Sequence, residues 1–292
     1  MRLTTQGIVL REVNYREADK ILTVLTRDFG KQTVKAPGCR RKTSRLTAGS
    51  QLLVYSDMTF HQRGEFTTLA EADPQQQFWG VREDLENLAL ASYFAEVTDS
   101  ACQEGEDSGE ILSLLLNCLY ALDTLKKPRE LVKAAFELRL LVLTGYEPLL
   151  DRCAVCGLRS PEGPRLNLSQ GVLHCARCRA GVGGGVSMPM TAGALAAARH
   201  IVSGNPKKLF SFSLAPESMA SLGTAAEAFL MTQHERGFRT LDYYKQLQRS
   251  IHGQKHPRLH SDRKMVLHCR RNESRHRFRH IPASKNRLRR RL

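Results

Sequence analysis

The fold is decided by residues 21–36, which read ILTVLTRDFGKQTVKA. A run rich in β-branched residues (21–26) leads into residues 28–31 (DFGK), a stretch typical of a hairpin turn. After the turn, lysine and threonine side chains point one way while Val34 and Ala36 point the other, as in a strand with one buried face. This stretch therefore predicts two adjacent antiparallel strands.

Three further strands are indicated on either side of this hairpin. The signals are the alternation of Ile8 and Leu10 with Val9 and Arg11, the shared apolar face of Leu52, Val54, Met58 and Phe60, and residues 66–70 after Gly64. Five short strands within about 70 residues leave no room for crossover helices, so we expect a small closed barrel in residues 1–80. An OB-type barrel is favoured because that fold closes on five strands, and an SH3-like barrel is the alternative.

Residues 81–250 change to helical periodicity. Apolar stripes are formed by Leu112, Leu115, Leu116, Leu119 and Leu122, and by Met219, Leu222, Ala226, Phe229 and Leu230. Residues 131–143 are apolar nearly all round, as expected of a central buried helix, and the helical pattern resumes at 191–202 after a loop-rich insertion at 151–190. The expected fold class is α+β and multidomain: an N-terminal five-stranded OB-type β-barrel, then an all-α domain that carries the insertion.

The net charge of +15 is concentrated near the C-terminus. Residues 251–292 hold 14 Lys/Arg and 2 Asp/Glu, a net charge of +12, whereas the preceding residues hold 30 basic and 27 acidic ones. This tail has little apolar content with which to offset the entropy of ordering, so we expect it to be disordered. Basic tails of this kind bind nucleic acids nonspecifically. A dispensable extension or a reading-frame artefact would explain it equally well.

Neither a signal peptide nor a membrane span is expected. Residues 1–20 mix charges with apolar residues, and no stretch approaches the ~20 apolar residues of a membrane span. We therefore expect a soluble cytoplasmic protein, with no membrane partner, whose eight cysteines are kept reduced.

Two cysteine pairs indicate a metal site. Cys153 and Cys156 form one C-x2-C pair, Cys175 and Cys178 form another, and 18 residues separate the pairs, which fits a zinc pattern. Four thiolates complete a tetrahedral shell and leave no position for water, so we expect one structural Zn²⁺ rather than a catalytic metal. His174 could replace a neighbouring cysteine, but a histidine beside a complete set is more often a bystander. Disulfides, a redox pair and chance are the competing interpretations.

A basic strip crosses the predicted barrel. Between residues 31 and 45 there are six basic residues and no acidic one: Lys31, Lys35, Arg40, Arg41, Lys42 and Arg45. Cationic side chains on a strand and its adjoining loop can follow a phosphate backbone. Tyr15, Tyr55 and Phe60 are candidate stacking platforms for unpaired bases. The alternative is a solvated basic loop with aromatic residues in the core.

No motif points to catalysis. The chain has no G-x-x-x-x-G-K-[ST] loop, no H-E-x-x-H and no G-x-S-x-G, and its acidic residues are scattered. We therefore expect a binding protein without enzymatic activity.

The sequence resembles the bacterial RecO family of DNA repair proteins in several ordered stretches. They are residues 7–11 (GIVLR), 15–23 (YREADKILT), 29–31 (FGK), 38–46 (GCRRKTSRL), 138–140 (LRL) and 144–148 (TGYEP), the last leading into the Cys153 pair. The similarity covers about residues 1 to 250. Pro37 departs from the family pattern, in which a polar or basic residue precedes the glycine, and the tail lies outside the pattern.

The resemblance implies a function in DNA repair and homologous recombination. Proteins of this family are mediators that bind single- and double-stranded DNA, anneal complementary strands, and work with RecR to load RecA onto DNA coated by single-strand binding protein. It further implies a cytoplasmic, nucleoid-associated protein of the RecF pathway, in which Arg40, Arg41, Lys42 and Arg45, together with Lys31 and Lys35, contact DNA. The alternatives are a zinc-containing nucleic-acid-binding module of transcription or RNA handling, and a scaffold whose basic strip binds an acidic peptide.

Overall fold

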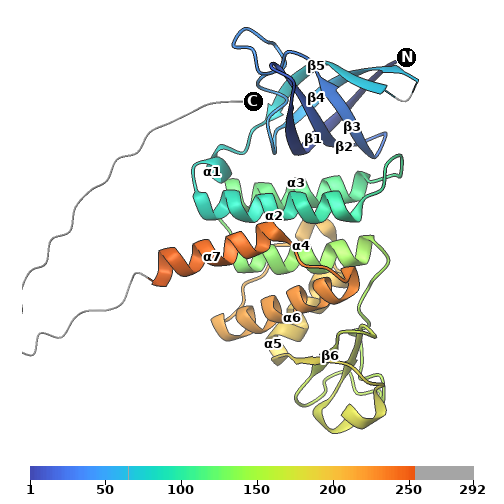
Figure 1. Cartoon of the computed structure of the whole chain (residues 1–292). Coiled ribbons are helices and arrows are strands. Elements are labelled where there is room, and N and C mark those ends of the chain that lie inside the picture. The colour runs from blue at the N-terminus through green and yellow to red at the C-terminus, as the bar shows by residue number, and fades with distance from the viewer. Residues whose placement is uncertain (65, 254–292) are drawn as a thin grey trace, which may run out of the picture. The chain divides into compact units, whose positions relative to one another are not determined.

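Five strands close into a barrel at the N-terminal end of the protein, as a computed structural model shows (Figure 1). The structure describes residues 1–64 and 66–253. The strands are β1 (Arg2–Tyr15), β2 (Asp19–Thr26), β3 (Lys31–Ala36), β4 (Tyr55–Arg63) and β5 (Phe66–Gln76). They follow the order β1-β2-β3-β5-β4, in which only the β3–β5 pair is parallel. The expectation of an N-terminal five-stranded OB-type barrel is confirmed.

The middle of strand β1 is buried on both faces. Its alternating side chains, Ile8 and Leu10 on one face and Val9 on the other, therefore enter two different cores. Val9 points into the barrel core beside Leu22 and Val24, whereas Ile8 and Leu10 point outward and belong to the hydrophobic core of the helices. A β-bulge between Val9 and Arg11 shifts the register with β2 at this point. One strand therefore contributes to two cores, which joins the barrel to the helices.

The predicted strand with Leu52 and Val54 begins later than expected. Leu53 has a left-handed backbone (φ 61°) and Val54 lies in the connection, so β4 starts at Tyr55. All three residues from Leu52 to Val54 still pack inward, and Leu53 is almost completely buried. The apolar pattern identified the buried side chains correctly but not the point at which strand pairing starts.

The helices that follow carry most of the hydrophobic core. They are α1 (Trp79–Arg82), α2 (Leu85–Ala101), α3 (Gly109–Asp123), α4 (Arg129–Leu143), α5 (Ala192–Ser203), α6 (Pro216–His234) and α7 (Arg239–Gly253), with a short 3-10 turn η2 (Pro206–Lys208) between α5 and α6. Helix α4 is buried nearly all round, as its sequence predicts, and packs against α3, α5 and α6. The predicted stripe on α3 is buried at Leu112, Leu115, Leu119 and Leu122, while Leu116 lies at its margin.

The insertion between α4 and α5 forms a small sheet of its own (Figure 1). Strands β6 (Arg165–Asn167), β7 (Val172–His174) and β8 (Ser187–Pro189) pair in the order β7-β6-β8, and a 3-10 segment η1 (Ala176–Gly181) follows β7. Leu166 and Leu173 connect this sheet to the hydrophobic core of the helices. The expected insertion is thus a folded element.

Gly30 allows the barrel to approach the helices closely. Its backbone is left-handed (φ 63°), and a Cβ added there would lie 2.0 Å from the carbonyl oxygen of Glu106, which precedes α3. Beside it, Thr33 Oγ1 donates a hydrogen bond of 2.7 Å to Glu104 Oε1. The hairpin glycine therefore serves the turn and the packing of two elements at once.

Within residues 1–64 and 66–253, no helix has both the length and the apolar content needed to cross a membrane. The expectation of a disordered basic tail concerns mainly residues outside the described ones, although α7 continues to Gly253.

Candidate metal centre and nucleic-acid interface

The four predicted cysteine ligands converge on one point. The Sγ atoms of Cys153, Cys156, Cys175 and Cys178 all lie within 4.8 Å of one another. A tetrahedron with Zn–S bonds of about 2.3 Å has edges of about 3.8 Å, so these thiols need to move by less than about 1 Å to hold such an ion. The cluster therefore has the geometry of a metal site.

Tight turns bring each pair of thiols together. The N–H of Gly157 donates to the carbonyl oxygen of Cys153 (2.9 Å), and Gly157 has a left-handed backbone (φ 75°). In the second pair, the N–H of Cys178 donates to the carbonyl oxygen of Cys175 (3.1 Å). Each C-x2-C pair thus presents two thiols from one turn, as metal binding requires.

The electrostatics of the cluster suit a dication. Burial disfavours a thiolate at Cys153, but hydrogen bonds from the backbone N–H groups of Cys156, Val155 and Cys175 outweigh it and lower the pKa of that thiol to about 6. Hydrogen bonds with the neighbouring thiols, Cys175 first, raise the pKa of Cys178 to about 12. Four thiolates repel one another at this distance, and a bound dication would remove that repulsion. The donor set therefore fits a metal ion such as Zn²⁺.

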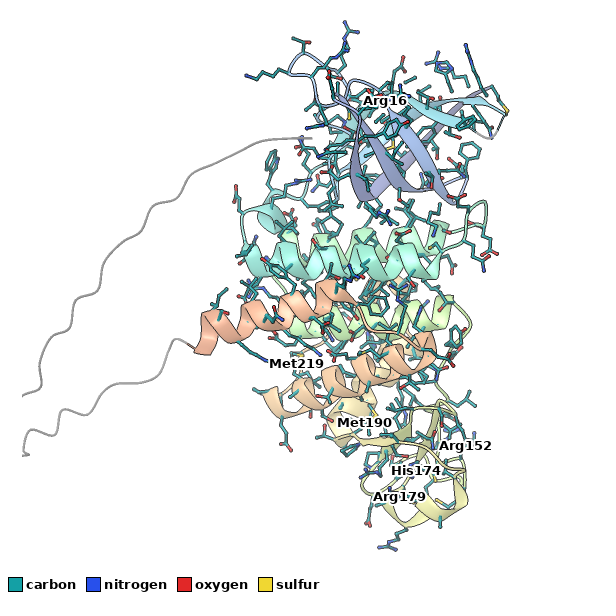
Figure 2. The ribbon with its side chains drawn as sticks, viewed as in Figure 1. Arg16, Arg152, His174, Arg179, Met190 and Met219 are labelled. Atoms are coloured by element: carbon teal, nitrogen blue, oxygen red, sulfur yellow. The ribbon has the colours of Figure 1, made fainter. Side chains whose placement is uncertain are left out.

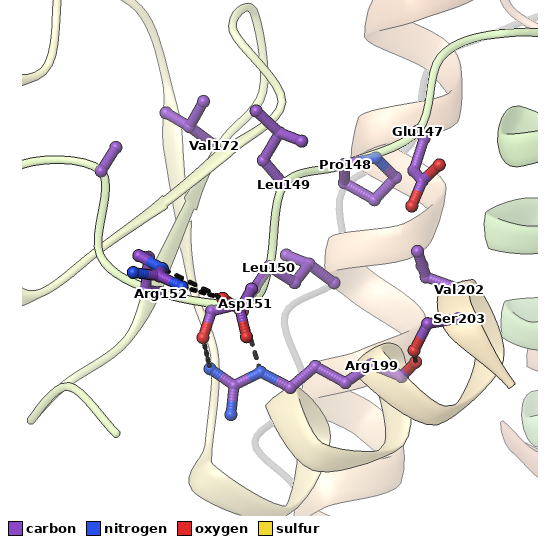
Figure 3. Close-up of a pocket in the computed structure, with 11 residues that line it drawn as sticks. Glu147, Pro148, Leu149, Leu150, Asp151, Arg152, Val172, Arg199, Val202 and Ser203 are labelled. Carbon is purple, nitrogen blue, oxygen red and sulfur yellow. Dashed lines mark hydrogen bonds and ion pairs between the residues drawn. The ribbon is translucent and has the colours of Figure 1, made fainter. Parts of the chain in front are cut away.

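Arg199 on α5 fastens the first turn of the cluster to the helical core (Figure 3). Its Nε donates to the carbonyl oxygen of Leu150 (2.8 Å), and its Nη2 donates to those of Asp151 (2.9 Å) and Arg159. These contacts border a cavity of about 490 Å³ whose lining includes Leu149 and Val172. The arginine therefore holds both sides of the Cys153 turn against one helix.

Among the described residues, His174 and the other three cysteines contribute no ligand atom to the cluster. Cys39, Cys102 and Cys118 are buried, and burial raises the pKa of each. The buried His174 ring lies 3.0 Å from the Cys175 carbonyl oxygen through Nδ1 and 2.9 Å from Ser187 Oγ through Nε2. Its two nitrogens are used within the sheet, which agrees with the expectation of a bystander.

The basic strip lies mostly in the connection between β3 and β4. The side chains of Arg40, Arg41, Lys42 and Arg45 are exposed, and no carboxylate of the described residues forms an ion pair with any of them. The connection is nevertheless well held. Thr47 Oγ1 donates to the carbonyl oxygens of Cys39 (2.8 Å) and Arg41 (3.2 Å). We call residues 37–47 the basic loop; it presents four unpaired cations on a fixed backbone.

Buried apolar residues anchor the basic loop in the barrel. Cys39 and Leu46, near its two ends, belong to the barrel core. Gly38 has a left-handed backbone (φ 63°), and its N–H donates to Asp19 Oδ1 (2.7 Å). Pro37 is exposed and precedes this glycine without disturbing that bond.

Lys31 and Lys35, unlike the arginines of the basic strip, lie close to carboxylates. Lys31 Nζ donates to the carbonyl oxygen of Asp99 (2.6 Å) and lies 3.2 Å from Asp99 Oδ1, so its charge is already compensated at the contact between the barrel and α2. Lys35 Nζ lies 3.0 Å from Asp19 Oδ2 and 5.7 Å from the centroid of the Tyr15 ring. Lys35 borders the basic loop, whereas Lys31 faces the helices.

Of the three candidate stacking residues, only Tyr15 has a substantially exposed ring. Phe60 is buried in the barrel core, and the hydroxyl of the half-buried Tyr55 donates to Gln6 Oε1 (2.9 Å). The interpretation of Phe60 as a platform is therefore wrong, because its side chain points into the barrel. Tyr15 lies at the end of β1, with the Arg16 guanidinium 5.2 Å from its ring centroid.

Residues 16–19 complete the basic loop, and sequence reasoning missed their part in it. Arg40 Nη1 donates to the carbonyl oxygens of Arg16 (3.4 Å) and Glu17 (3.1 Å), and the Arg40 N–H donates to that of Ala18 (3.0 Å). Arg16 lies at the end of the barrel far from α2 (Figure 2). Hydrogen bonds from the Gly38 N–H and from Lys35 hold the pKa of Asp19 below its usual value. The β1–β2 turn and the basic loop thus form one surface, but the contacts span about 20 residues of sequence and leave no local signal.

This protein combines a closed OB-type barrel that carries an unpaired cationic loop with helices that carry an insertion whose four clustered cysteines have the geometry to hold a metal ion. Residues 1–78 match the family model "Recombination protein O N terminal", and residues 82–242 match "Recombination protein O C terminal". The chain belongs to the RecO family, whose members are DNA repair and recombination proteins.

Individual relatives agree with this assignment over most of their length. The DNA repair protein RecO of Acetivibrio thermocellus is 32% identical over 248 residues, which cover 85% of this chain and 98% of the relative. The RecO of Caldicellulosiruptor bescii is 31% identical over 247 residues, which cover 84% of this chain and 99% of the relative. The resemblance noted in the sequence is therefore confirmed.

Proposed function

We propose that this protein is a recombination mediator that binds single- and double-stranded DNA, anneals complementary strands, and helps load a RecA recombinase onto DNA coated by single-strand binding protein. RecR and single-strand binding protein are the proposed partners, and RecA is an indirect one. Family membership supports the general role in DNA repair and recombination. The observation that carries the DNA-binding step is the set of unpaired cations on the basic loop.

Phosphate neutralisation is the proposed chemical basis of annealing. Arg40, Arg41, Lys42 and Arg45 present their charges on the outside of the barrel, where a flexible strand can reach them. Cations that neutralise phosphates release condensed counterions and reduce the repulsion between two strands. Tyr15 borders the same surface and offers an aromatic face for a base, and Lys35 beside it is a fifth cation that is already paired with Asp19. Lys31 is left out of this surface because its ammonium lies against Asp99 at the contact with α2.

We further propose a division of labour between the parts of the chain. Residues 1–80 would bind nucleic acid, residues 81–250 would form the helical domain, and residues 251–292 would form a basic tail. One Zn²⁺ held by Cys153, Cys156, Cys175 and Cys178 would stabilise the insertion, and no catalytic step is assigned to it, because four thiolates leave no open coordination position. The protein would act without enzymatic turnover, in the cytoplasm near the nucleoid.

Charge reversal on the basic loop tests the proposal. Arg40→Glu with Arg41→Glu removes two phosphate contacts, which should lower the salt slope of single-strand binding by about 1.4 at about 0.7 per contact. The matched control is Arg179→Glu with Arg249→Glu, which reverses two exposed arginines on the insertion and on α7. Fluorescence anisotropy with a labelled single-stranded oligonucleotide of about 15 thymidines (dT15) measures the salt slopes of binding. Annealing of strands coated by single-strand binding protein measures the function.

The two measurements separate the possible failures. We expect the loop variant to lose affinity and annealing, with an unchanged zinc content, while the control keeps both. Equal salt slopes in loop variant and control would move the DNA site away from the basic loop. Failure of the unmodified chain to accelerate annealing would refute the mediator proposal, and a preference for RNA would favour a role in RNA handling.

A further inference from the structure

A second surface with arginine side chains, which also carries three carboxylates, lies where the barrel meets the helices. It is a groove of about 600 Å³ lined by β1, the second half of α2 and the start of α7. Arg11 contributes to it from β1, Arg239 from the first position of α7, and Arg236 from the segment before that helix. The volume falls within the range of about 300–1,000 Å³ that is common for ligand sites.

The acidic residues of the groove are already compensated. Glu12 Oε2 accepts a hydrogen bond of 2.8 Å from Lys20, and Asp99 Oδ1 lies 3.2 Å from Lys31 Nζ. Glu96 Oε2 accepts hydrogen bonds from the N–H (3.0 Å) and the hydroxyl of Thr240. Burial opposes the charge of Glu96, but these two bonds, together with a backbone bond from Arg239 and the charge of Arg236, outweigh it and lower the pKa of that carboxyl.

The arginines keep their charge available on one side of the groove. Arg236 is held in place, because its Nη1 donates to Ser100 Oγ (3.0 Å) and its Nη2 lies 3.9 Å from Glu96 Oε1. Arg11 and Arg239 are exposed, and among the described residues neither forms an ion pair with a carboxylate. The groove therefore presents two unpaired guanidinium groups, which suits an anionic ligand.

The outer face of the β1–β2 hairpin connects this groove to the basic loop. Arg11, Val13 and Tyr15 alternate along β1 and pair with Thr23, Ile21 and Asp19 of β2, so they share one face. Val13 is 45% exposed and Tyr15 is 40% exposed, which leaves apolar side chains between two sets of cations. From Arg11 to Tyr15 the strand runs about 14 Å, or about four phosphate spacings of a stacked strand.

We propose that a single nucleic-acid strand continues from the basic loop across Tyr15 and Val13 into this groove, where Arg11 and Arg239 bind its phosphates. The inference rests on the proposed function and adds to it a specific path that includes the helical part of the chain. The alternation of apolar and cationic side chains favours a single strand over a duplex, because base faces can pack on Val13 and Tyr15 only when the bases are not held in a paired duplex.

Double charge reversal of Arg11→Glu and Arg239→Glu tests the path in the full chain. Loss of two contacts at about 0.7 per contact should lower the salt slope for dT15 by about 1.4 and weaken binding about 25-fold at about 0.1 M salt. The conservative pair Arg11→Lys with Arg239→Lys should retain most of the slope, since the charge stays. Thermal unfolding of each variant shows that it is folded.

Comparison with the other variants decides between outcomes. If the groove variant binds dT15 like the control pair Arg179→Glu with Arg249→Glu, the path is wrong. If in that case the basic-loop variant is still weakened, only this inference falls and the proposed DNA site stands. If the basic-loop variant is unaffected as well, the proposed DNA site fails together with the path.

Discussion

Replacement of Lys133 by methionine should destabilise the protein strongly, because this lysine compensates one buried and one half-buried carboxylate. Lys133 Nζ lies 2.7 Å from Glu137 Oε1 on the same helix and 2.9 Å from Glu227 Oε2 on α6. The Tyr93 hydroxyl of α2 donates to Glu137 Oε1 (2.8 Å), and Lys245 of α7 pairs with Glu227. One network therefore ties four helices together, with two positive and two negative charges.

The size of the effect follows from burial. Glu137 has no exposed surface, and its Oε2 has no hydrogen-bond partner among the described residues, so it depends on Lys133 for compensation. Removal of one partner of a buried pair costs about 3–5 kcal/mol. For a chain of this size, that corresponds to a fall of about 6–20 °C in melting temperature. Lys207→Met, an exposed lysine without an ion pair among the described residues, is the matched control.

The loss of unfolding free energy in Lys133→Met should also depend on pH. Burial raises the pKa of Glu137, and Lys133 offsets part of that rise. Without Lys133 the folded-state pKa rises further above the unfolded value of about 4.3. Between these two pKa values, Glu137 holds a proton in the folded state and releases it in the unfolded state. The stability of the variant relative to the parent chain therefore falls as the pH rises from the unfolded-state pKa to the folded-state pKa. We expect a larger deficit at pH 8 than at pH 5.

Urea unfolding followed by circular dichroism at the two pH values measures this prediction. Lys133→Met combined with Glu137→Leu removes both charges of the pair and should recover most of the lost stability, because apolar replacements of buried pairs are often neutral. Loss of less than about 1 kcal/mol in the single variant, or an equal loss at both pH values, would show that the network is solvated and would refute the reasoning.

Three further predictions concern the contact between barrel and helices, the zinc content, and the contact of Arg199 with the Cys153 turn. Gly30→Ala should cost about 1–2 kcal/mol more than Gly145→Ala in scanning calorimetry, because both positions have positive φ but only the first places a Cβ 2.0 Å from Glu106. Equal losses would contradict the close approach. Metal analysis should find one equivalent of zinc, and Arg199→Ala should speed its loss to a chelator by about tenfold or more, since it frees the Cys153 turn. Absence of zinc would refute the metal proposal. An unchanged rate of zinc loss in Arg199→Ala would refute only the role of Arg199 in holding the Cys153 turn.

The features that the sequence predicted well are those with local causes. A strand alternates every two residues and a C-x2-C turn is complete within four, so residues 21–36 and the cysteine pairs indicate structure without knowledge of the rest. The burial of α4 was predictable for the same reason, because its apolar residues cover all sides of one helix. The start of β4 was not, because the left-handed Leu53 depends on packing between elements.

The features that escaped prediction depend on contacts between distant residues. Asp19 holds the Gly38 N–H across 19 residues, and Arg239 meets Arg11 in one groove although 228 positions separate them. Phe60 and Tyr15 are both aromatic residues in strands, yet one fills the barrel core and the other is exposed. Residue type alone cannot distinguish these roles, since exposure is set by which face of the strand meets another element.

Charge compensation distinguishes cations that stabilise the fold from cations that remain available to a ligand. In the helices, Arg129 pairs with Asp84 and Glu86, and Lys133 pairs with two glutamates, so these cations stabilise the fold and leave little field outside. On the barrel, the basic loop has cations without carboxylate partners, held on a backbone that buried residues anchor. An unpaired cation on a fixed backbone keeps its attraction for phosphate, whereas a paired one must first lose its partner. The groove beside α7 joins the barrel in this respect, because Arg239 belongs to the helical part of the chain but lacks a carboxylate partner among the described residues. Within the part of the chain that the structure describes, the proposed binding cations therefore share the absence of a carboxylate partner, whichever domain they lie in.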